Sequence, residues 1–401
     1  MQRYLRTRLG LQMFLCGAVN GAWQPVLPPY LKQLGLGEFE IAVCLATVPV
    51  ATMISPLAAG QAADRWFASG RLVSLLSLLT GVLMFAARPI VGFAPFVGAF
   101  FAAMLVAAPL FPMSTSLALQ NLPDGARDFP LVRACGTLGH VSGANLLSLW
   151  LWITHGSFRD CLLVAGILAL TNAVYSLTLP NTPPRRDTAG RSAIGRAAGM
   201  LRDPGTALFF GLLFCVQLFG TSYYARGPLF LLESGVSREG LSSLMSVGQI
   251  TEVAVVLLLP VIFGRWGAKG TIAVGIAAWS ARFFFWSAAS SFPPLVTAVA
   301  LHGVCFACAR IASTIYVDRI CPRDARSSAQ SLLSLAVDGS GNFLGNFLIG
   351  AVATRYTIGG AVQWGRVWKV PAVGCAAVLL VFLLAFRPRR GPVDAPAPAA
   401  D

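Results

Sequence analysis

Six charged side chains interrupt the long apolar stretches of this 401-residue chain: Arg133, Arg226, Glu252, Arg282, Arg310 and Asp338. Charge inside hydrocarbon is costly, so such residues mark ion pairs, proton paths or substrate sites by default. A buried carboxylate beside an arginine or a histidine is the minimum arrangement for carrying a proton. The sequence therefore predicts proton coupling through four residues, namely Glu252, Arg282, His302 and Asp338.

Several of these residues also have purely structural explanations. Glu252 could form a static ion pair that holds its helix to a neighbour. Asp338 lies in a glycine-containing segment and could serve helix packing, and His302 could be a buried core histidine. Arg310 could extend its long side chain to the aqueous face. No role is assigned to Arg226 or Arg310 from the sequence.

Two sets of polar residues have the spacing of one helix face. Gln249 and Glu252 are three residues apart, and Arg133, Thr137 and His140 follow one another at intervals of four and three. Residues three or four apart in an α-helix lie on the same side. Each set therefore predicts a polar stripe on an otherwise apolar helix.

The composition indicates the elements that position these residues. Hydrophobic residues make up 56% of the chain and charged residues 11%, against about 25% charged in an average soluble domain. The mean hydropathy of +0.70 and the apolar runs near twenty residues predict an all-α membrane protein. The predicted transmembrane spans are 9–31, 39–62, 71–88, 93–119, 131–154, 159–179, 206–232, 238–263, 269–289, 293–317, 327–353 and 366–386.

These twelve helices divide into two pseudo-symmetric six-helix bundles. The predicted domains are an N-terminal bundle (1–180), a basic cytoplasmic linker (181–205), a C-terminal bundle (206–387) and a disordered Pro/Ala-rich tail (388–401). The pairs Gly139/Gly143 and Gly341/Gly345 stand at corresponding places in the two halves. Small residues four apart permit close helix contact, and repeated halves favour a two-bundle transporter.

The net charge of +14 is explained by membrane topology rather than by nucleic-acid binding. With both termini in the cytoplasm, 19 of the 30 Lys and Arg residues fall on the cytoplasmic side, 7 on the opposite side and 4 within helices. An excess of Lys and Arg marks cytoplasmic loops. We therefore expect a multi-pass protein of the bacterial inner membrane with both termini inside.

The connection after the second span contains a glycine, acid and arginine pattern at Gly60, Asp64, Arg65, Gly70 and Arg71. It resembles, in a degraded form, the signature loop of the major facilitator superfamily. Glycine permits a tight turn, the acid can cap a helix, and the arginines can bridge to a neighbouring helix. We expect these five residues to form a gating latch on the cytoplasmic side.

Within that superfamily, the chain resembles the bacterial nucleoside:proton symporters. The resemblance runs over most of the chain and is densest at residues 60–66, 119–121, 128–139, 245–252, 278–283 and 325–330. It implies uptake of nucleosides with protons by alternating access, and a substrate site containing Arg133, Thr137, Gln249 and Glu252.

The chain departs from that family at three positions of the implied site. His140 replaces an aromatic residue, Ala307 replaces an acid in the tenth helix, and Thr221 and Tyr224 stand in for a polar pair in the seventh. His140, Thr221 and Tyr224 complete the predicted substrate-binding set. A more distant likeness to lactose-permease-type symporters rests on His302, although Cys305 replaces the glutamate expected after it.

Other functions stay open or are disfavoured. A permease for a sugar or a small aromatic or carboxylic acid is the alternative, and a drug exporter would need a helix-five antiporter motif that is absent. The sequence has no nucleotide-binding loop, catalytic residues or metal-ligand spacing, so we expect no enzyme, metal or cofactor. We expect a monomer whose partners are a small-molecule substrate, protons and lipid, driven by the proton gradient.

Overall fold

The computed structural model describes residues 2–122, 124–180, 199–321 and 326–388, and its chain forms two compact units. Unit 1 comprises Met1–Asp187 with Tyr223–Ile250, and unit 2 comprises Thr188–Ser222 with Thr251–Asp401. The predicted tail lies outside the described residues except for Pro388. Of the predicted linker, only residues 199–205 are described.

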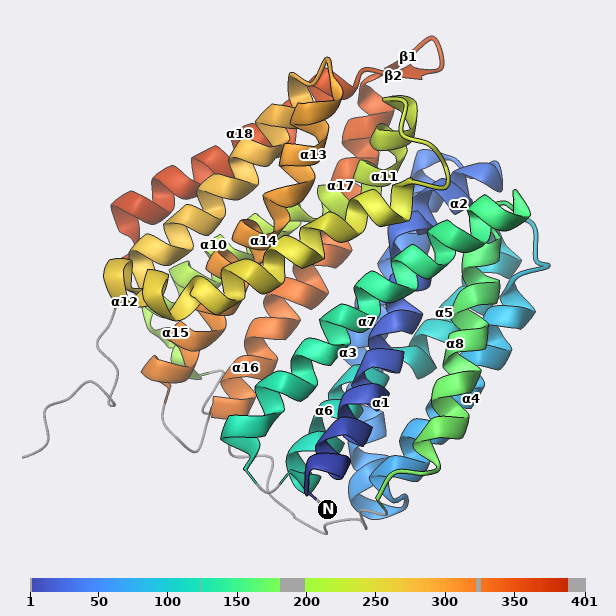
Figure 1. The fold of residues 1–401 in the computed structure, drawn as a ribbon. Coiled ribbons are helices and arrows are strands. Elements are labelled where there is room, and N and C mark those ends of the chain that lie inside the picture. The colour runs from blue at the N-terminus through green and yellow to red at the C-terminus, as the bar shows by residue number, and fades with distance from the viewer. Residues whose placement is uncertain (1, 123, 181–198, 322–325, 389–401) are drawn as a thin grey trace, which may run out of the picture. The chain divides into compact units, whose positions relative to one another are not determined.

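Unit 1 is built of helices throughout its described part (Figure 1). They are α1 (Gln2–Trp23), the 3-10 turn η1 (Gln24–Val26), α2 (Leu27–Gln33), α3 (Glu38–Arg65), α4 (Ser69–Ala87), α5 (Phe93–Ala107), α6 (Leu110–Asn121), α7 (Gly125–Thr154), α8 (Asp160–Ser176), nearly all of α11 (Ser222–Glu233), and α12 (Leu241–Ser287) as far as Ile250.

Unit 2 contains the remainder of α12 and the helices that follow it. Its elements are η2 (Met200–Arg202), α10 (Pro204–Gly220), α13 (Phe292–Ala300), α14 (His302–Val304), the π-helix η3 (Cys305–Ile311), α15 (Ala312–Ile320), α16 (Arg326–Ser334), the π-helix η5 (Leu335–Gly341), α17 (Asn342–Arg355), the strands β1 (Thr357–Ile358) and β2 (Ala361–Val362), and α18 (Trp364–Ala385). The two strands form an antiparallel hairpin in which Thr357 is opposite Val362.

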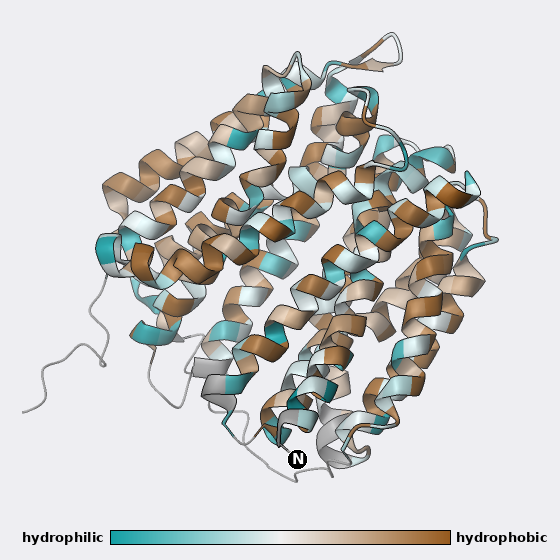
Figure 2. Ribbon diagram, in the orientation of Figure 1, coloured by the Kyte–Doolittle hydropathy of each residue, from teal (hydrophilic) through white to brown (hydrophobic). Residues whose placement is uncertain are grey.

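Helix occupies each of the twelve predicted spans. Within the described residues, eight helical segments have the length and hydropathy to cross a membrane, and α18 is hydrophobic along nearly its whole length (Figure 2). Two predicted spans are merged in α12, which is interrupted at Gly267 with φ 63° and ψ −175°. Glycine adopts this conformation readily because it lacks a Cβ.

Helix interruptions recur at corresponding places in the two halves of the sequence. The first span is broken at η1, and its counterpart, the seventh, is broken where α10 gives way to α11. The fourth span is divided between α5 and α6, and the tenth contains the π-helix η3. Interrupted helices at matching positions in two repeats are the usual place for a transporter's binding site.

The connection between α3 and α4 is shorter than the sequence suggested. Helix α3 continues to Arg65, so Gly60, Asp64 and Arg65 lie in its last turns, whereas we predicted a loop. Gly70 and Arg71 lie in the first turn of α4. Only residues 66–68 are left between the two helices, because the alanine-rich end of the second span is a good helix former. The gating role of these residues stays a prediction.

Both predicted glycine pairs are points of close helix contact, which confirms the prediction. In unit 1, a side chain added at Gly139 or Gly143 would collide with backbone carbonyls of α1, at Phe14 and Ala18. In unit 2, a Cβ on Gly345 would collide with the carbonyl of Leu218 in α10, and a Cβ on Gly341 would meet the side chain of Gln217. The first and fifth helices, and likewise the seventh and eleventh, are therefore packed backbone to backbone.

Replacing Gly139 with alanine is expected to lower the stability of the protein by about 1–3 kcal/mol, because overpacking shifts backbone that cannot move freely. The new Cβ would meet the carbonyl of Phe14. Thermal unfolding of the purified protein in detergent measures the effect. Gly98→Ala in α5 is the control, since nothing lies within 4 Å of a Cβ there. Equal melting temperatures for the two variants would show that the α1–α7 contact is not tight.

Candidate functional site

Arg133 and Thr137 lie together on α7, as their spacing predicted. Nη1 of Arg133 is 3.5 Å from Oγ1 of Thr137. The guanidinium lies over the ring of Phe111 in α6, with its carbon 4.6 Å from the ring centroid. A cation held against an aromatic face keeps its remaining N–H groups directed outward. The pair thus offers a half-buried hydrogen-bonding group on this helix.

The other predicted substrate residues of unit 1 are half-buried and lie on α7, α11 and α12. His140 follows Thr137 on α7, at the level where Gly21 of α1 touches its backbone. Tyr224 of α11 packs edge-on against Tyr223, with ring centroids 4.9 Å apart. Gln249 lies on α12, one turn before Glu252. An imidazole, a phenol ring and an amide are suited to stacking on and hydrogen bonding with a nucleobase.

A polar contact that the sequence analysis missed joins α7 to the first part of α12. Asn145 donates from Nδ2 to Oγ of Ser246 at 3.2 Å and accepts at Oδ1 from Oγ of Ser243 at 2.8 Å. The backbone N–H of Ser243 donates to Oγ of Ser148 at 3.1 Å. The signal was the spacing of Asn145 and Ser148 on one face of α7. These bonds fix the helix segment that carries Gln249.

Glu252, His302 and Arg282 form a line of three side chains in unit 2. Oε2 of Glu252 is 3.9 Å from Nε2 of His302, and Nδ1 of His302 is 3.3 Å from Nη1 of Arg282. Arg282 is completely buried and lies over the ring of Trp279 at 5.0 Å. Three of the four residues predicted to couple protons are therefore brought together.

The geometry of this line assigns the proton on His302. A guanidinium can only donate hydrogen bonds, so the bond from Arg282 needs an unprotonated Nδ1. The imidazole is then neutral, with its proton on Nε2 and directed at the carboxylate of Glu252.

A glycine and a threonine hold the helices together at this point. A Cβ on Gly303 would meet the backbone of Thr251 and Glu252, so only glycine allows α14 to approach α12 so closely. The hydroxyl of Thr251 donates to the carbonyl of Ala300 at 2.7 Å. The close approach places His302, the neighbour of Gly303, beside Glu252.

Asp338, the fourth predicted coupling residue, lies apart from this line and pairs with Arg310. The carboxylate accepts from Nη2 of Arg310 at 2.5 Å and from Nε at 3.0 Å. Arg310 also donates to Thr314 and Ser334. Each member of the pair lies in a π-helix, Arg310 in η3 and Asp338 in η5. Single π-turns inside α-helices occur frequently at functional sites.

Thr221, the remaining predicted substrate residue, is almost fully buried at the end of α10. Its hydroxyl lies 2.8 Å from Oδ1 of Asn342 in α17, and the same oxygen accepts from Nε2 of Gln217 at 2.6 Å. Asn342 donates from Nδ2 to the backbone carbonyl of Asp338 at 2.8 Å. Asn342 was not singled out in the sequence, because a lone asparagine in a helix carries no spacing signal.

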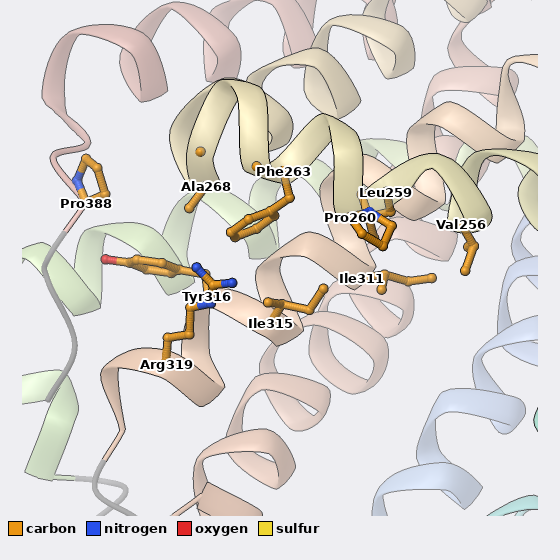
Figure 3. Close-up of a pocket in the computed structure, with 12 residues that line it drawn as sticks. Val256, Leu259, Pro260, Phe263, Ala268, Ile311, Ile315, Tyr316, Arg319 and Pro388 are labelled. Atoms are coloured by element: carbon orange, nitrogen blue, oxygen red, sulfur yellow. The ribbon is translucent and has the colours of Figure 1, made fainter. Parts of the chain in front are cut away.

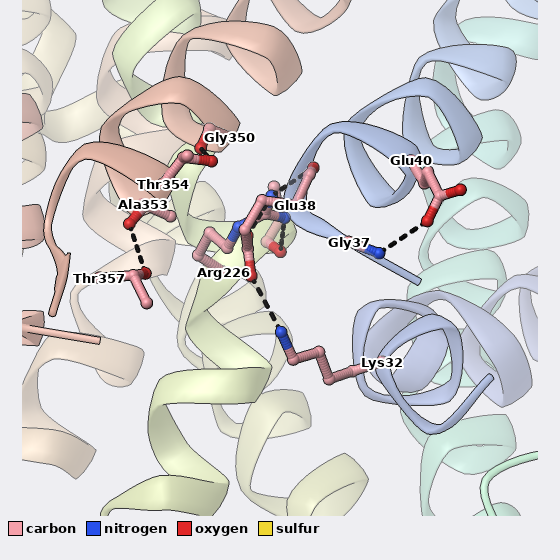
Figure 4. A network of polar contacts seen from close by, with 10 residues as sticks. Lys32, Gly37, Glu38, Glu40, Arg226, Gly350, Ala353, Thr354 and Thr357 are labelled. Atoms are coloured by element: carbon pink, nitrogen blue, oxygen red, sulfur yellow. Dashed lines mark hydrogen bonds and ion pairs between the residues drawn. The ribbon is translucent and has the colours of Figure 1, made fainter. Parts of the chain in front are cut away.

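Arg226, to which the sequence gave no role, belongs to an ion-pair network in unit 1 (Figure 4). The side chain is completely buried, and its Nη2 lies 2.8 Å from Oε2 of Glu38 at the start of α3. The same group donates to the backbone carbonyl of Glu38 at 3.2 Å. Lys32, at the end of α2, lies 3.3 Å from the other carboxylate oxygen. The network joins α11, from the second half of the sequence, to the first two spans.

A pocket in unit 2 contains none of the predicted site residues. This cavity of about 690 Å³ lies beside α12 and α15 and is lined mostly by apolar side chains, with Arg319 over Phe263 at one side (Figure 3). Among the described residues, no group of three or more His, Cys, Asp or Glu could hold a metal ion. All nine cysteines are free thiols.

Comparison with known proteins identifies the family of this chain. A family model described as nucleoside H+ symporter matches residues 3–391. The chain is 29% identical to the putative nucleoside transporter YegT of Escherichia coli (95% of this chain, 93% of that protein) and 27% identical to the xanthosine permease of the same organism (96% of each).

The crystal structure of the nucleoside transporter NupG superposes with a TM-score of 0.86 at 22% identity, covering 96% of this chain and 100% of that one. That likeness establishes the major facilitator fold. The relatives are transporters, so the protein is a transporter and not an enzyme. Because the family model spans nearly all of the sequence, the chain belongs to the nucleoside H+ symporter family.

Proposed function

We propose that the protein takes up nucleosides together with protons, by alternating access, with Glu252 as the proton-carrying residue. The observation that carries this proposal is the line from Glu252 through His302 to Arg282. A carboxylate that faces a neutral imidazole can gain a proton from water and release it again, while the imidazole keeps its own proton. Membership of the nucleoside H+ symporter family supports the same activity.

We further propose that the substrate is bound by Arg133, Thr137, His140, Thr221, Tyr224, Gln249 and Glu252. Arg133, Gln249 and Glu252 provide hydrogen bonds for ribose hydroxyls and base edges, and Tyr224 and His140 provide rings on which a base can stack. The half-buried state of all of these except Thr221 supports this role. Thr221 is buried, and its hydroxyl lies 2.8 Å from Oδ1 of Asn342.

Asp338 is proposed as a second proton-accepting group. Its pair with Arg310 is half-exposed, at 36% for the Asp338 side chain and 18% for Arg310, so water reaches the carboxylate. Arg310 and Asp338 lie in η3 and η5, whereas Glu252 and Arg282 lie in α12.

The proposed setting is the bacterial inner membrane, with both termini in the cytoplasm, lipid around a monomeric protein and the proton gradient as the only energy source. The distribution of Lys and Arg residues supports this orientation. The gating latch at Gly60, Asp64, Arg65, Gly70 and Arg71 is proposed on the same side. Fusion of a periplasm-active reporter to the C-terminus should give no signal, and a strong signal would reverse the orientation.

A competition experiment tests the substrate class. Cells expressing the protein are given one radiolabelled nucleoside, and excess unlabelled purine and pyrimidine nucleosides, sugars and aromatic carboxylic acids are added in turn. We expect only nucleosides to reduce uptake. Reduction by a sugar or an aromatic acid, with no effect of any nucleoside, would replace the proposed substrate with that compound class.

A further inference from the structure

We propose that Asn342 is a positioning residue that links the substrate side of α10 to the Asp338–Arg310 ion pair. The inference deepens the proposed function, because it rests on Thr221 as a substrate residue and on Asp338 as a proton acceptor. It assigns a role to a side chain that touches neither the reacting carboxylate nor, by itself, the substrate.

The amide oxygen of Asn342 is hydrogen bonded to Gln217 and Thr221. This atom, Oδ1, accepts from Nε2 of Gln217 at 2.6 Å and lies 2.8 Å from the hydroxyl of Thr221. Gln217 lies in the last turn of α10, and Thr221 is the residue that follows the helix. A single amide oxygen thus fixes two polar side chains at the point where α10 ends and α11 begins.

The amide nitrogen of Asn342 is hydrogen bonded to the segment that carries the ion pair. Nδ2 of Asn342 donates to the backbone carbonyl of Asp338 at 2.8 Å, so both ends of the side chain are occupied. Asp338 uses its carboxylate for Arg310, at 2.5 and 3.0 Å. Asn342 is therefore bonded to the backbone of the very residue whose side chain holds the ion pair.

The segment that joins Asp338 to Asn342 is not a regular α-helix. Asp338 lies in the π-helix η5, which ends at Gly341, and Asn342 begins α17. A π-turn contains one residue more than the α-helical ladder needs, so a small shift can restore α-helical bonding. Protonation of Asp338 would weaken its attraction to Arg310 and release this constraint on η5.

A shift of η5 would be transmitted to α10, because α17, which continues η5, is in backbone contact with α10. A Cβ on Gly345 would collide with the carbonyl of Leu218 and the side chain of Thr221. The contact is so close that α17 cannot shift without displacing α10. A shift of the Asp338 carbonyl changes the bond to Asn342 and hence the orientation of Gln217 and Thr221. Substrate affinity on α10 then depends on the protonation of Asp338.

Nucleoside uptake by proteoliposomes, measured as KM and Vmax at several external pH values, tests the link. Wild-type KM is expected to change with external pH. Asn342→Ala is expected to raise KM about tenfold, which corresponds to about 1.4 kcal/mol, because Gln217 and Thr221 lose the amide oxygen that fixes them. Its Vmax should stay within about twofold of wild type. In this variant KM should no longer respond to pH.

Asn346→Ala is the matched control. Asn346 lies one turn further along α17 and is buried, and its side-chain amide donates to the backbone carbonyl of Asn342. It should keep the wild-type pH response. Asn342→Ser, whose hydroxyl is too short to reach both sides, should behave as Asn342→Ala does and provides a second variant if the alanine form is unstable.

Combination with Asp338→Asn completes the test. If Asn342 acts through Asp338, the double variant should show no further loss of pH response beyond either single variant. A normal pH response of KM in both Asn342 variants would overturn the proposal, as would a loss confined to Vmax. Absence of nucleoside uptake by the wild-type protein would instead overturn the proposed function, so the two failures are distinguishable.

Discussion

Glu252→Gln is expected to abolish accumulation of nucleoside against its gradient while leaving exchange of nucleoside across the membrane intact. Glutamine has the size of glutamate and, like protonated glutamate, both donates and accepts hydrogen bonds, but it cannot release a proton. One pH unit across the membrane is worth about 1.4 kcal/mol per proton, enough for roughly tenfold accumulation with one proton per nucleoside. In the variant the ratio of internal to external nucleoside should fall to about one.

The measurement is uptake of radiolabelled nucleoside into proteoliposomes with an inward proton gradient, followed by counterflow without a gradient. Glu239→Gln is the control, because this residue precedes α12 in the sequence and lies outside the Glu252 line. It should accumulate nucleoside as wild type does. Gradient-driven accumulation that persists in Glu252→Gln would remove Glu252 from the coupling mechanism and leave the pair of Asp338 and Arg310 as the candidate.

Arg226→Ala is expected to destabilise the protein by about 3–5 kcal/mol, the cost of breaking a buried ion pair by removing one partner. Arg226 is completely buried, and the carboxylate of Glu38 is 14% exposed, so water screens the pair poorly. The variant leaves Glu38 with Lys32, whose side chain is 51% exposed and which lies farther away, at 3.3 Å. Thermal unfolding of the detergent-solubilised protein measures the loss.

Arg238→Ala is the matched control for this prediction. Like Arg226, Arg238 bonds from the segment Tyr223–Ile250 to the first part of the chain, donating to the carbonyl of Gly156 at 3.1 Å, but it is exposed. Its loss should cost no more than about 1 kcal/mol. A double variant with Glu38→Gln should be less destabilised than the sum of the single changes. Equal melting temperatures for the two arginine variants would contradict an energetically important pair.

The sequence was sufficient for the architecture because hydropathy and glycine spacing are local signals. Apolar runs near twenty residues predicted twelve helical spans, and helix occupies each of them. The pairs Gly139/Gly143 and Gly341/Gly345 predicted close packing, and each pair lies in close contact with another helix. Boundaries were less accurate: α3 extends to Arg65, because alanine-rich sequence continues a helix past the end of its apolar run.

Side-chain partners depend on which helices meet, and spacing along one helix does not contain that information. Arg133 and Thr137 were predictable as a pair because they share α7. The pairing of Arg226 with Glu38 joins residues 188 positions apart, and that of Arg310 with Asp338 joins two π-helices. A charged residue in an apolar run predicts that a partner exists, and only the fold identifies it.

Asn342 shows the same limit for uncharged residues. An asparagine within a helix is compatible with packing, capping or solvent exposure, so its type alone predicts nothing specific. Its importance follows from three hydrogen bonds to Gln217, Thr221 and the backbone of Asp338, which come from two helices. The π-turn before it is equally invisible in the sequence, since it differs from an α-helix by a single residue.

The central claim is that proton entry drives nucleoside uptake by this protein. Purified wild-type protein in liposomes, given an inward proton gradient and one radiolabelled nucleoside, tests it most directly. We expect transient accumulation above the external concentration, and collapse of that accumulation when a protonophore is added. Equilibration of the nucleoside without accumulation, unchanged by the protonophore, would contradict the account and make the protein a facilitator of nucleoside diffusion.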